Sequence, residues 1–287
     1  MARRKHGKKA SFLKYIFLFA FLLVLVYPFL EARNITVDEQ TLLIPSLSKD
    51  LQGLKIVYVS DIHQGTLFSQ TKVNDLVAKI NEHSPDLVLL GGDYGNTTAG
   101  AIVFFQNLPA IQANLGTFAV LGNHDHEGAS KDGIELLKSA IRNTGIVPLV
   151  NETREIRYKS ASFFVSGIDD YVHGSPDISA VSSSVSQEDF VIFLTHTPDA
   201  FPEAFNALDK NGHLHWFDLG LAGHTHGGQV TFFGTPLFRN YNLVSDKYLT
   251  GWLQENRAHT LVSNGVGTVI LPARFFAKPQ IHVITIK

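Results

Sequence analysis

Residues 220–228 have the sequence Gly-Leu-Ala-Gly-His-Thr-His-Gly-Gly, which places His224 and His226 one residue apart in a glycine-flanked turn. The apolar stretch from Phe217 to Ala222 precedes this turn and predicts a strand, and the glycines allow the chain to turn tightly after it. We therefore expect two imidazoles to project from one strand end towards the same small volume. Such a pair is also common among polar loop residues, so its interpretation depends on what the other strand ends supply.

The bulk composition narrows the classes of protein. The chain has 287 residues, of which 45% are hydrophobic, and this is enough to build a buried core. Its formal net charge is -2, so no overall positive field attracts nucleic acid. The absence of cysteine excludes disulfides, thiolate metal sites and cysteine nucleophiles. Any metal must therefore be bound by nitrogen and oxygen atoms.

An apolar stretch near the N-terminus predicts a membrane-spanning helix. Residues 1–11 form a basic segment, and the chain from Phe12 to Leu30 is almost wholly apolar apart from Lys14. Its length is close to the roughly 20 residues that a helix needs to cross a bilayer. Because the basic residues precede the stretch, the positive-inside rule places the following chain outside the cytoplasm. We expect a single uncleaved anchor over residues 12–31 and a lead-in over residues 32–54.

Two other interpretations of the apolar stretch remain open. A secretory signal peptide would be cut after a small residue such as Ala32, but Leu30 and Glu31 before it make a poor cleavage site. The stretch could also be the core helix of a soluble protein.

Strand and helix units follow from Lys55 onward. Apolar runs at residues 56–59, 87–90 and 117–121 predict buried strands, and helical spacing or apolar segments separate them. Ligands bind at the carboxyl ends of the strands in sheets of this kind. Each run ends in polar residues at that place: Asp61-Ile62-His63, Gly92-Asp93 and Gly122-Asn123-His124-Asp125.

The second half of the chain is richer in short predicted strands. A further apolar run over residues 190–194 ends at Thr195-His196, and the strand before the opening stretch ends at Gly223-His224. The last third is expected to be mainly β-structure. No linker interrupts this part, so we expect one domain over residues 55–287.

Together, the strand ends supply seven side chains with metal-binding atoms. Carboxylate, amide and imidazole groups suit Mn²⁺, Fe or Zn²⁺ better than a soft metal. Seven groups are too many for one tetrahedral ion, and they fit two ions about 3.5 to 4 Å apart that share a carboxylate. The candidate ligands are Asp61, His63, Asp93, Asn123, His196, His224 and His226.

In this order, the motifs resemble those of the calcineurin-like metallophosphoesterase superfamily, and the resemblance covers residues 55–287. It implies an α/β fold of two mixed β-sheets packed face to face with helices outside, a four-layer α/β/β/α sandwich. It also implies two divalent metal ions per chain, with Mn²⁺ expected first and Fe or Zn²⁺ as alternatives. By resemblance, one ion is bound by Asp61, His63, Asp93 and His226, and the other by Asp93, Asn123, His196 and His224.

The same resemblance gives catalytic roles to His124 and Asp125. His124 would stabilise the pentacoordinate phosphate or protonate the leaving oxygen, and Asp125 would orient its imidazole. Taken singly, each motif has a plain alternative, such as a helix cap, a loop histidine or a turn asparagine. Outside the motifs, His126 and His173 are candidates for substrate contact, because His126 adjoins the predicted catalytic turn and His173 follows Asp169-Asp170 in a predicted loop.

The implied reaction is hydrolysis of a phosphodiester or pyrophosphate bond by hydroxide that the two cations activate. The apolar helix and the sequence Gly-His-Thr-His-Gly-Gly-Gln are similar to a bacterial membrane-associated branch, which includes enzymes resembling UDP-2,3-diacylglucosamine pyrophosphatase. This favours a membrane-associated or lipid-linked substrate at a bacterial cell membrane. Asn96 departs from this pattern, because many relatives have an acid there. An outward-facing domain also does not suit a cytoplasmic nucleotide sugar.

Other functions remain open from the sequence. A phosphomonoesterase, including a protein phosphatase, would use the same ligands, and a metal-binding protein without turnover would retain them as well. The expected partners are a phosphoester small molecule or lipid-linked substrate and the membrane. Nucleic acid is not expected, and the oligomeric state is left open.

Overall fold

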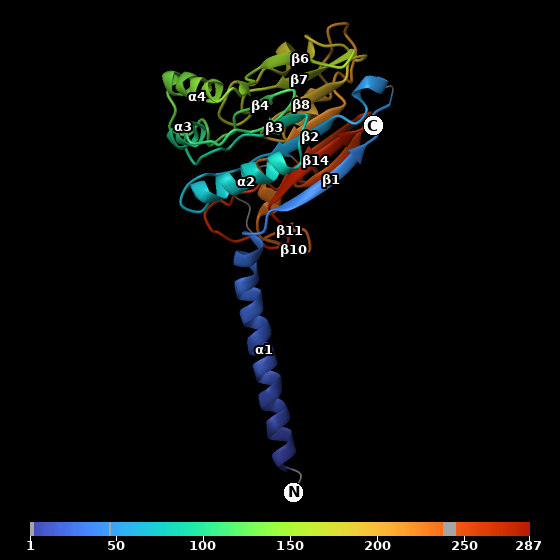
Figure 1. Ribbon diagram of the computed structural model, residues 1–287. Helices are drawn as coiled ribbons and strands as arrows, with labels where there is room; N and C mark the ends of the chain where they lie inside the picture. The colour runs from blue at the N-terminus through green and yellow to red at the C-terminus, as the bar shows by residue number, and fades with distance from the viewer. Residues whose placement is uncertain (1–2, 46, 238–244) are drawn as a thin grey trace.

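Two six-stranded β-sheets lie face to face in the computed structural model, which describes residues 3–45, 47–237 and 245–287 (Figure 1). The first sheet has the order β1 (Thr36–Leu42), β14 (Gln280–Ile286), β2 (Lys55–Val59), β3 (Leu87–Leu90), β4 (Thr117–Ala119) and β5 (Val147–Pro148). The second has the order β12 (Gly251–Glu255), β13 (Ala258–Val262), β9 (Leu219–Ala222), β8 (Val191–Leu194), β7 (Ala161–Gly167) and β6 (Glu152–Tyr158).

Both sheets are mixed. In the first, β14 runs antiparallel to β2, whereas β2, β3 and β4 are mutually parallel. In the second, β7, β8, β9 and β13 are parallel, and β6 and β12 pair antiparallel at the two edges. The expected pair of mixed sheets is therefore confirmed.

The central strands are apolar on both faces because each face is covered. In β2, Ile56 and Tyr58 belong to the core between the sheets, whereas Val57 and Val59 belong to the core beneath the outer helices. Successive side chains of a strand point to opposite faces, so a continuous apolar run is what a doubly covered strand requires. The same alternation continues in β3, β8 and β9.

Helices complete the outer layers. α2 (Gln70–Glu82), α3 (Thr98–Gln106) and α4 (Lys131–Asn143) contribute side chains to the core on the outer face of the first sheet. The short helices α5 (Ile178–Ser182) and α6 (Ala200–Ala204) do the same for the second sheet. In α4 the buried Leu137, Ala140 and Ile141 lie at helical spacing on one side. The resulting order of layers is helix, sheet, sheet, helix.

Smaller elements connect these layers. β10 (Thr231–Phe232) and β11 (Thr235–Pro236) form a two-stranded hairpin. Turns of 3-10 helix cover Lys49–Leu51, His226–Gly228 and Asp246–Tyr248.

A long helix, α1 (Arg3–Glu31), leads away from the domain (Figure 1). Its segment Phe12–Glu31 has a mean hydropathy of 2.3, and its large apolar side chains are exposed. By length and composition, this segment can cross a membrane.

The segment expected as a lead-in is part of the packed domain. Within it, β1 pairs in parallel with β14 over seven residues, from Thr36 opposite Gln280 to Leu42 opposite Ile286. Asp38 Oδ2 also lies 3.1 Å from His282 Nδ1. The sequence did not predict this pairing, because the partner strand is at the other end of the chain and leaves no local signal in residues 32–54.

Two neighbouring leucines provide a test of this packing. Leu42 is 7% exposed in the core between the sheets, whereas Leu43 is 72% exposed. We expect Leu42→Ala to lower the free energy of unfolding by about 2–4 kcal/mol, because it leaves a cavity in the core. Leu43→Ala should change it by less than about 0.5 kcal/mol. Chemical denaturation in detergent measures both, and equal effects would mean that this segment does not pack on the sheets.

Candidate metal centre

The candidate ligands come from five strands whose carboxyl ends meet at one edge of the two sheets. Asp61 and His63 follow β2, and Asp93 follows β3. Asn123 follows β4, His196 follows β8, and the histidine pair follows β9. At this edge, three groups of side chains, one of which includes His124, have potential ligand atoms that all lie within 4.8 Å of one another. They are Asp61 with His63 and His226, His63 with Asp93 and His124, and Asp61 with Asp93 and His196.

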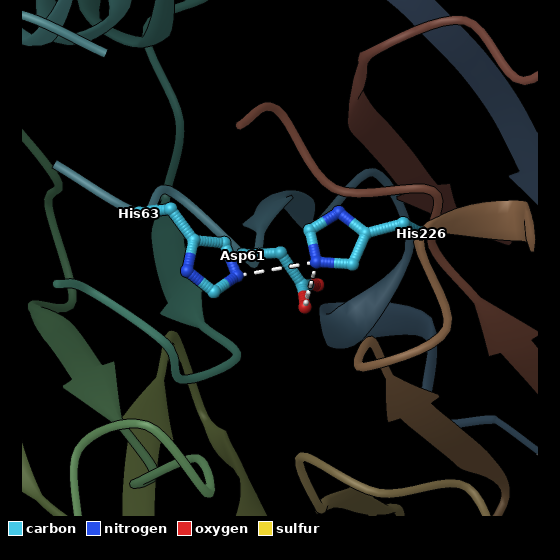
Figure 2. A group of neighbouring side chains, drawn as sticks. All are labelled: Asp61, His63 and His226. Carbon is cyan, nitrogen blue, oxygen red and sulfur yellow. Dashed lines mark hydrogen bonds and ion pairs between the residues drawn. The ribbon is translucent and has the colours of Figure 1, made fainter. Parts of the chain in front are cut away.

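The first group converges on one point between its ring nitrogens and carboxylate (Figure 2). His63 Nε2 lies 3.1 Å from His226 Nε2, and His226 Nε2 lies 3.6 Å from Asp61 Oδ1. Two imidazole nitrogens that point at each other beside a carboxylate oxygen form a donor set for a cation. All three side chains are buried.

Asp93 lies between this group and a second group, which consists of Asn123, His196 and His224. Its Oδ2 is 3.5 Å from His63 Nε2 and 3.3 Å from His196 Nε2. Asn123 Oδ1 is in turn 3.2 Å from His196 Nε2 and 2.9 Å from His224 Nδ1. The structure therefore brings all seven predicted side chains together, with Asp93 in the middle.

The backbone at the site is strained. Five of the seven residues have positive φ although none is glycine: Asp61 at 53°, His63 at 50°, Asp93 at 57°, His224 at 71° and His226 at 52°. Such left-handed conformations cost energy for residues with a Cβ and tend to cluster at functional sites. Here they aim successive side chains inward from short loops.

The glycines beside the ligands are required by close approach. A Cβ on Gly122 would collide with the Asp93 carboxylate, and one on Gly223 would collide with the Asp61 carboxylate. Both glycines therefore allow a neighbouring loop to lie directly against a buried acid. This accounts for the glycines that precede Asn123 and His224 in the sequence motifs.

Hydrogen bonds fix the orientation of two rings. His196 Nδ1 lies 2.7 Å from the backbone oxygen of Gly91 and donates to it. His63 Nδ1 lies 3.0 Å from Asn96 Oδ1. In each case the bond at Nδ1 leaves the Nε2 lone pair facing the other ligands, an arrangement that metal-binding histidines commonly have. The sequence marked Asn96 only as a departure from relatives, and its contact with His63 is visible only in the structure.

The electrostatics favour a cation. Burial lowers the pKa of His63, His224 and His226, to about 3 for His224, so these rings are neutral near pH 7 with lone pairs available. Burial alone would raise the pKa of Asp93, but the charge of His196 and its hydrogen bond to Asp93 hold it well below its usual range. Burial would lower the pKa of His196, but Asp93 raises it well above its usual value. An ionised carboxylate beside the neutral rings of His63, His224 and His226 matches the nitrogen and oxygen donors that Mn²⁺, Fe and Zn²⁺ accept.

His124 stands at the rim of the site, and its partner differs from the expected one. Its ring edge faces His63, with ring centroids 5.0 Å apart, and its side chain is 31% exposed. Its Nδ1 lies 2.8 Å from Glu127 Oε2. The expected partner, Asp125, instead accepts hydrogen bonds from the backbone nitrogens of Asp93, Tyr94 and Gly122 at 2.8 to 3.1 Å. Asp125 is thus buried behind the ligands and holds the Asp93 loop, and Glu127 contacts the ring.

The two histidines considered for substrate contact have protein partners. His126 Nε2 lies 2.9 Å from Asp169 Oδ1, and this carboxylate raises the pKa of His126 although burial opposes it. The backbone nitrogen of His173 donates to Asp170 Oδ2 at 2.5 Å. The His126 contact brings the loop of residues 169–173 next to the turn that carries Asn123 and His124, whereas the His173 bond lies within that loop.

Sequence reasoning missed Arg274, which has no exposed surface. Its guanidinium donates to the backbone oxygens of Asn264 at 2.7 Å, Gly267 at 2.6 Å and Ala277 at 2.8 Å. It also reaches the backbone oxygen of His226 at 3.3 Å. Arg274 therefore ties several loops together behind His226, and no motif in the sequence marks it.

The family of the chain is shown by comparison with known proteins. A family model described as calcineurin-like phosphoesterase matches residues 54–228. The metallophosphoesterase YkuE of Bacillus subtilis (strain 168) is 32% identical over 265 residues, which cover 90% of this chain and 88% of the relative. The range that the family model matches includes all seven strand-end side chains.

Two further relatives have informative names. Phosphodiesterase YaeI of Escherichia coli (strain K12) is 28% identical over 236 residues, which cover 80% of this chain and 81% of the relative. A transmembrane protein with metallophosphoesterase domain from Danio rerio is 28% identical over 264 residues, which cover 85% of this chain and 55% of that protein.

These similarities agree with the geometry of the strand ends, where aspartate and histidine side chains form groups that can hold metal. Proteins of this family typically bind divalent metals. The chain belongs to the calcineurin-like phosphoesterase family and is a metal-dependent phosphoester hydrolase.

Proposed function

We propose that the site holds two divalent cations and hydrolyses a phosphodiester or pyrophosphate bond. One cation is assigned to Asp61, His63, Asp93 and His226, and the other to Asp93, Asn123, His196 and His224. The observation that carries this assignment is the position of Asp93 Oδ2, which lies within 3.5 Å of both His63 Nε2 and His196 Nε2. A carboxylate placed between two donor groups suits a shared ligand of two ions.

When bound, the two cations supply Lewis acidity to the phosphoryl oxygens and lower the pKa of water, so that hydroxide is available near neutral pH. The protein orients the donor atoms through the bonds of Gly91 and Asn96 to the ligand rings. We assign proton donation to the leaving oxygen, or stabilisation of the charge on the phosphoryl group, to His124. Because its Nδ1 contacts Glu127, its Nε2 is the ring nitrogen assigned to the substrate.

We propose a membrane-associated or lipid-linked substrate. The support is α1, whose apolar segment would keep the site close to a bilayer and its headgroups. The basic residues before this segment favour a single-pass protein of the bacterial cell membrane with its domain outside the cytoplasm. Mn²⁺ is the proposed metal, with Fe and Zn²⁺ as alternatives. The similarity to UDP-2,3-diacylglucosamine pyrophosphatases stays a prediction.

The metal requirement is tested on the full chain in detergent. We expect a chelator to abolish hydrolysis of bis-p-nitrophenyl phosphate and Mn²⁺ to restore it, with about two metal ions bound per chain. The rate with p-nitrophenyl phosphate is measured in the same sample. A preference for the diester supports the proposal, whereas a preference for the monoester would assign the chain a phosphomonoesterase activity. Full activity after verified metal removal would contradict a metal-dependent reaction.

The role of His124 is tested by His124→Ala. We expect turnover to fall by roughly 10² to 10⁴-fold, the range for loss of a general acid or of a group that stabilises transition-state charge. Metal content, measured by elemental analysis, should stay unchanged because the ring is not among the assigned ligands. Loss of both ions in this variant would show that His124 holds metal instead.

The role of Asn96 is tested by comparing two substitutions. Asn96→Ala removes the acceptor for His63 Nδ1, so we expect metal affinity to fall by about 10 to 100-fold, as for other partners of ligand histidines. Asn96→Asp keeps an acceptor in the same place and should retain the affinity. Metal titration measures both. The role is ruled out if the alanine variant binds metal as tightly as the unchanged protein.

A further inference from the structure

Six large apolar side chains are exposed on two loops at one end of the domain. Three come from the β10–β11 hairpin and the residue after it, and three come from the loop before β14. Phe233 is 87% exposed and Ile270 is 82% exposed, so these two have almost no protein contact. We name this set the apolar tip: Phe232, Phe233, Leu237, Ile270, Leu271 and Phe276.

The two loops of the apolar tip are joined to each other. Val230 forms a β-bridge with Phe275, and the backbone nitrogen of Thr231 donates to the Phe275 oxygen at 2.8 Å. The Gln229 side chain adds a clamp, because its Nε2 donates to the Val269 oxygen and its Oε1 accepts from the Val269 nitrogen, both at 2.9 Å. The two loops that carry the tip are therefore held together.

The same loops are attached to the end of α1. The backbone nitrogen of Arg274 donates to the Pro28 oxygen at 2.9 Å, and that of Ala277 donates to Glu31 Oε1 at 3.0 Å. The rings of Tyr27 and Phe275 meet edge to face, with centroids 5.8 Å apart. Figure 1 shows β10 and β11 at the foot of the domain, where α1 leaves it. These contacts fix the position of the tip along the axis of α1.

If α1 spans the bilayer, this position places the tip at the interface between membrane and water. The apolar segment of α1 ends at Glu31, so the hydrocarbon region ends close to this residue. A cavity of about 330 Å³ lies between α1 and the tip and is lined by apolar side chains of both, including Tyr27, Leu30 and Phe276. Exposed aromatic and aliphatic groups are stable at this depth, whereas water would solvate them poorly.

Two cationic side chains lie at the same end of the domain. Arg33 and Lys72 line a second cavity, of about 340 Å³, together with Phe29 and Ala32 at the end of α1. Lys72 Nζ donates to the Leu67 oxygen at 2.8 Å, and burial together with the charge of Arg33 lowers the pKa of Lys72. Positive groups just outside an apolar surface are suited to lipid phosphates.

We propose that the apolar tip, with Arg33 and Lys72 beside it, docks on the phospholipid surface around α1. The tip enters the boundary between headgroups and acyl chains, and the two cations meet lipid phosphates. This inference rests on the proposed membrane anchor. The docking adds to the anchor a fixed orientation of the catalytic domain towards the bilayer. An anchor helix followed by a freely moving domain would not provide this orientation.

The loops of the apolar tip are also connected to the metal centre. Gln229 and Arg274 hold the loops of the tip, and the turn that carries His226 directly precedes Gln229. The guanidinium of Arg274 contacts the His226 backbone, and its own backbone contacts α1. The loops on the membrane are therefore extensions of a ligand-bearing turn, which fits a substrate whose phosphoester lies at the bilayer surface.

The test uses tryptophan fluorescence of the full chain in phosphatidylcholine vesicles. Phe233→Trp and Ile270→Trp place a probe at the tip. Leu136→Trp is the matched control, because Leu136 is 63% exposed on α4, a helix that lies far from α1 in Figure 1. The chain has two native tryptophans, so each spectrum is compared with that of the unchanged protein. We expect blue-shifted emission and quenching by lipids brominated near the headgroup for the two tip variants, and neither effect for the control.

Each outcome decides the proposal. Quenching at the tip equal to that of Leu136→Trp overturns it, and blue-shifted emission without quenching would show that protein, such as a second copy of the chain, covers the tip. Vesicle flotation and diesterase activity are measured on the same samples. If the protein does not float with the vesicles, both the membrane anchor and the docking of the tip are contradicted. If it floats and is active but the tip is not quenched, only the docking is contradicted. With anionic lipid added, quenching should increase, and Arg33→Gln combined with Lys72→Gln should abolish that increase.

Discussion

The buried carboxylate of Asp93, shared between the imidazoles of His63 and His196, is the interaction on which the site depends. A buried negative charge is costly unless it is paired and hydrogen-bonded. Here the backbone nitrogen of His124 donates to Asp93 Oδ1, and Asp125 holds the Asp93 backbone from behind. The loops after β3 and β4 are thereby locked together. Their position fixes where the other ligands must meet.

The two-sheet architecture makes this convergence possible. Ligands after β2, β3 and β4 come from one sheet, and those after β8 and β9 come from the other. The core between the sheets fixes the distance between these two edges, so neither sheet alone completes the site. Side chains at the edge can therefore be strained and polar, because the apolar layers beneath them supply the stability.

Arg274 links this rigid centre to the N-terminal helix. Its buried guanidinium donates to several backbone oxygens and lies 3.3 Å from His226 Nδ1, and its own backbone nitrogen bonds to Pro28. Unlike a flexible tether, this connection gives α1 a defined exit from the domain. A protein that meets its substrate at a surface benefits from such a fixed approach.

The sequence by itself determined which side chains meet at the strand ends and in which order they occur, because each apolar strand run ends in a motif with atoms that can bind metal. It also predicted the alternation of strands and helices and the apolar helix near the N-terminus. Only the tertiary structure decided that β1 pairs with β14, that Asn96 orients His63, that Glu127 rather than Asp125 contacts His124, and that Arg274 supports His226. Most of these contacts join residues far apart in the chain, and all of them depend on the direction of individual side chains or backbone groups. Local patterns record burial and strand ends, but they do not record which distant group a side chain will meet.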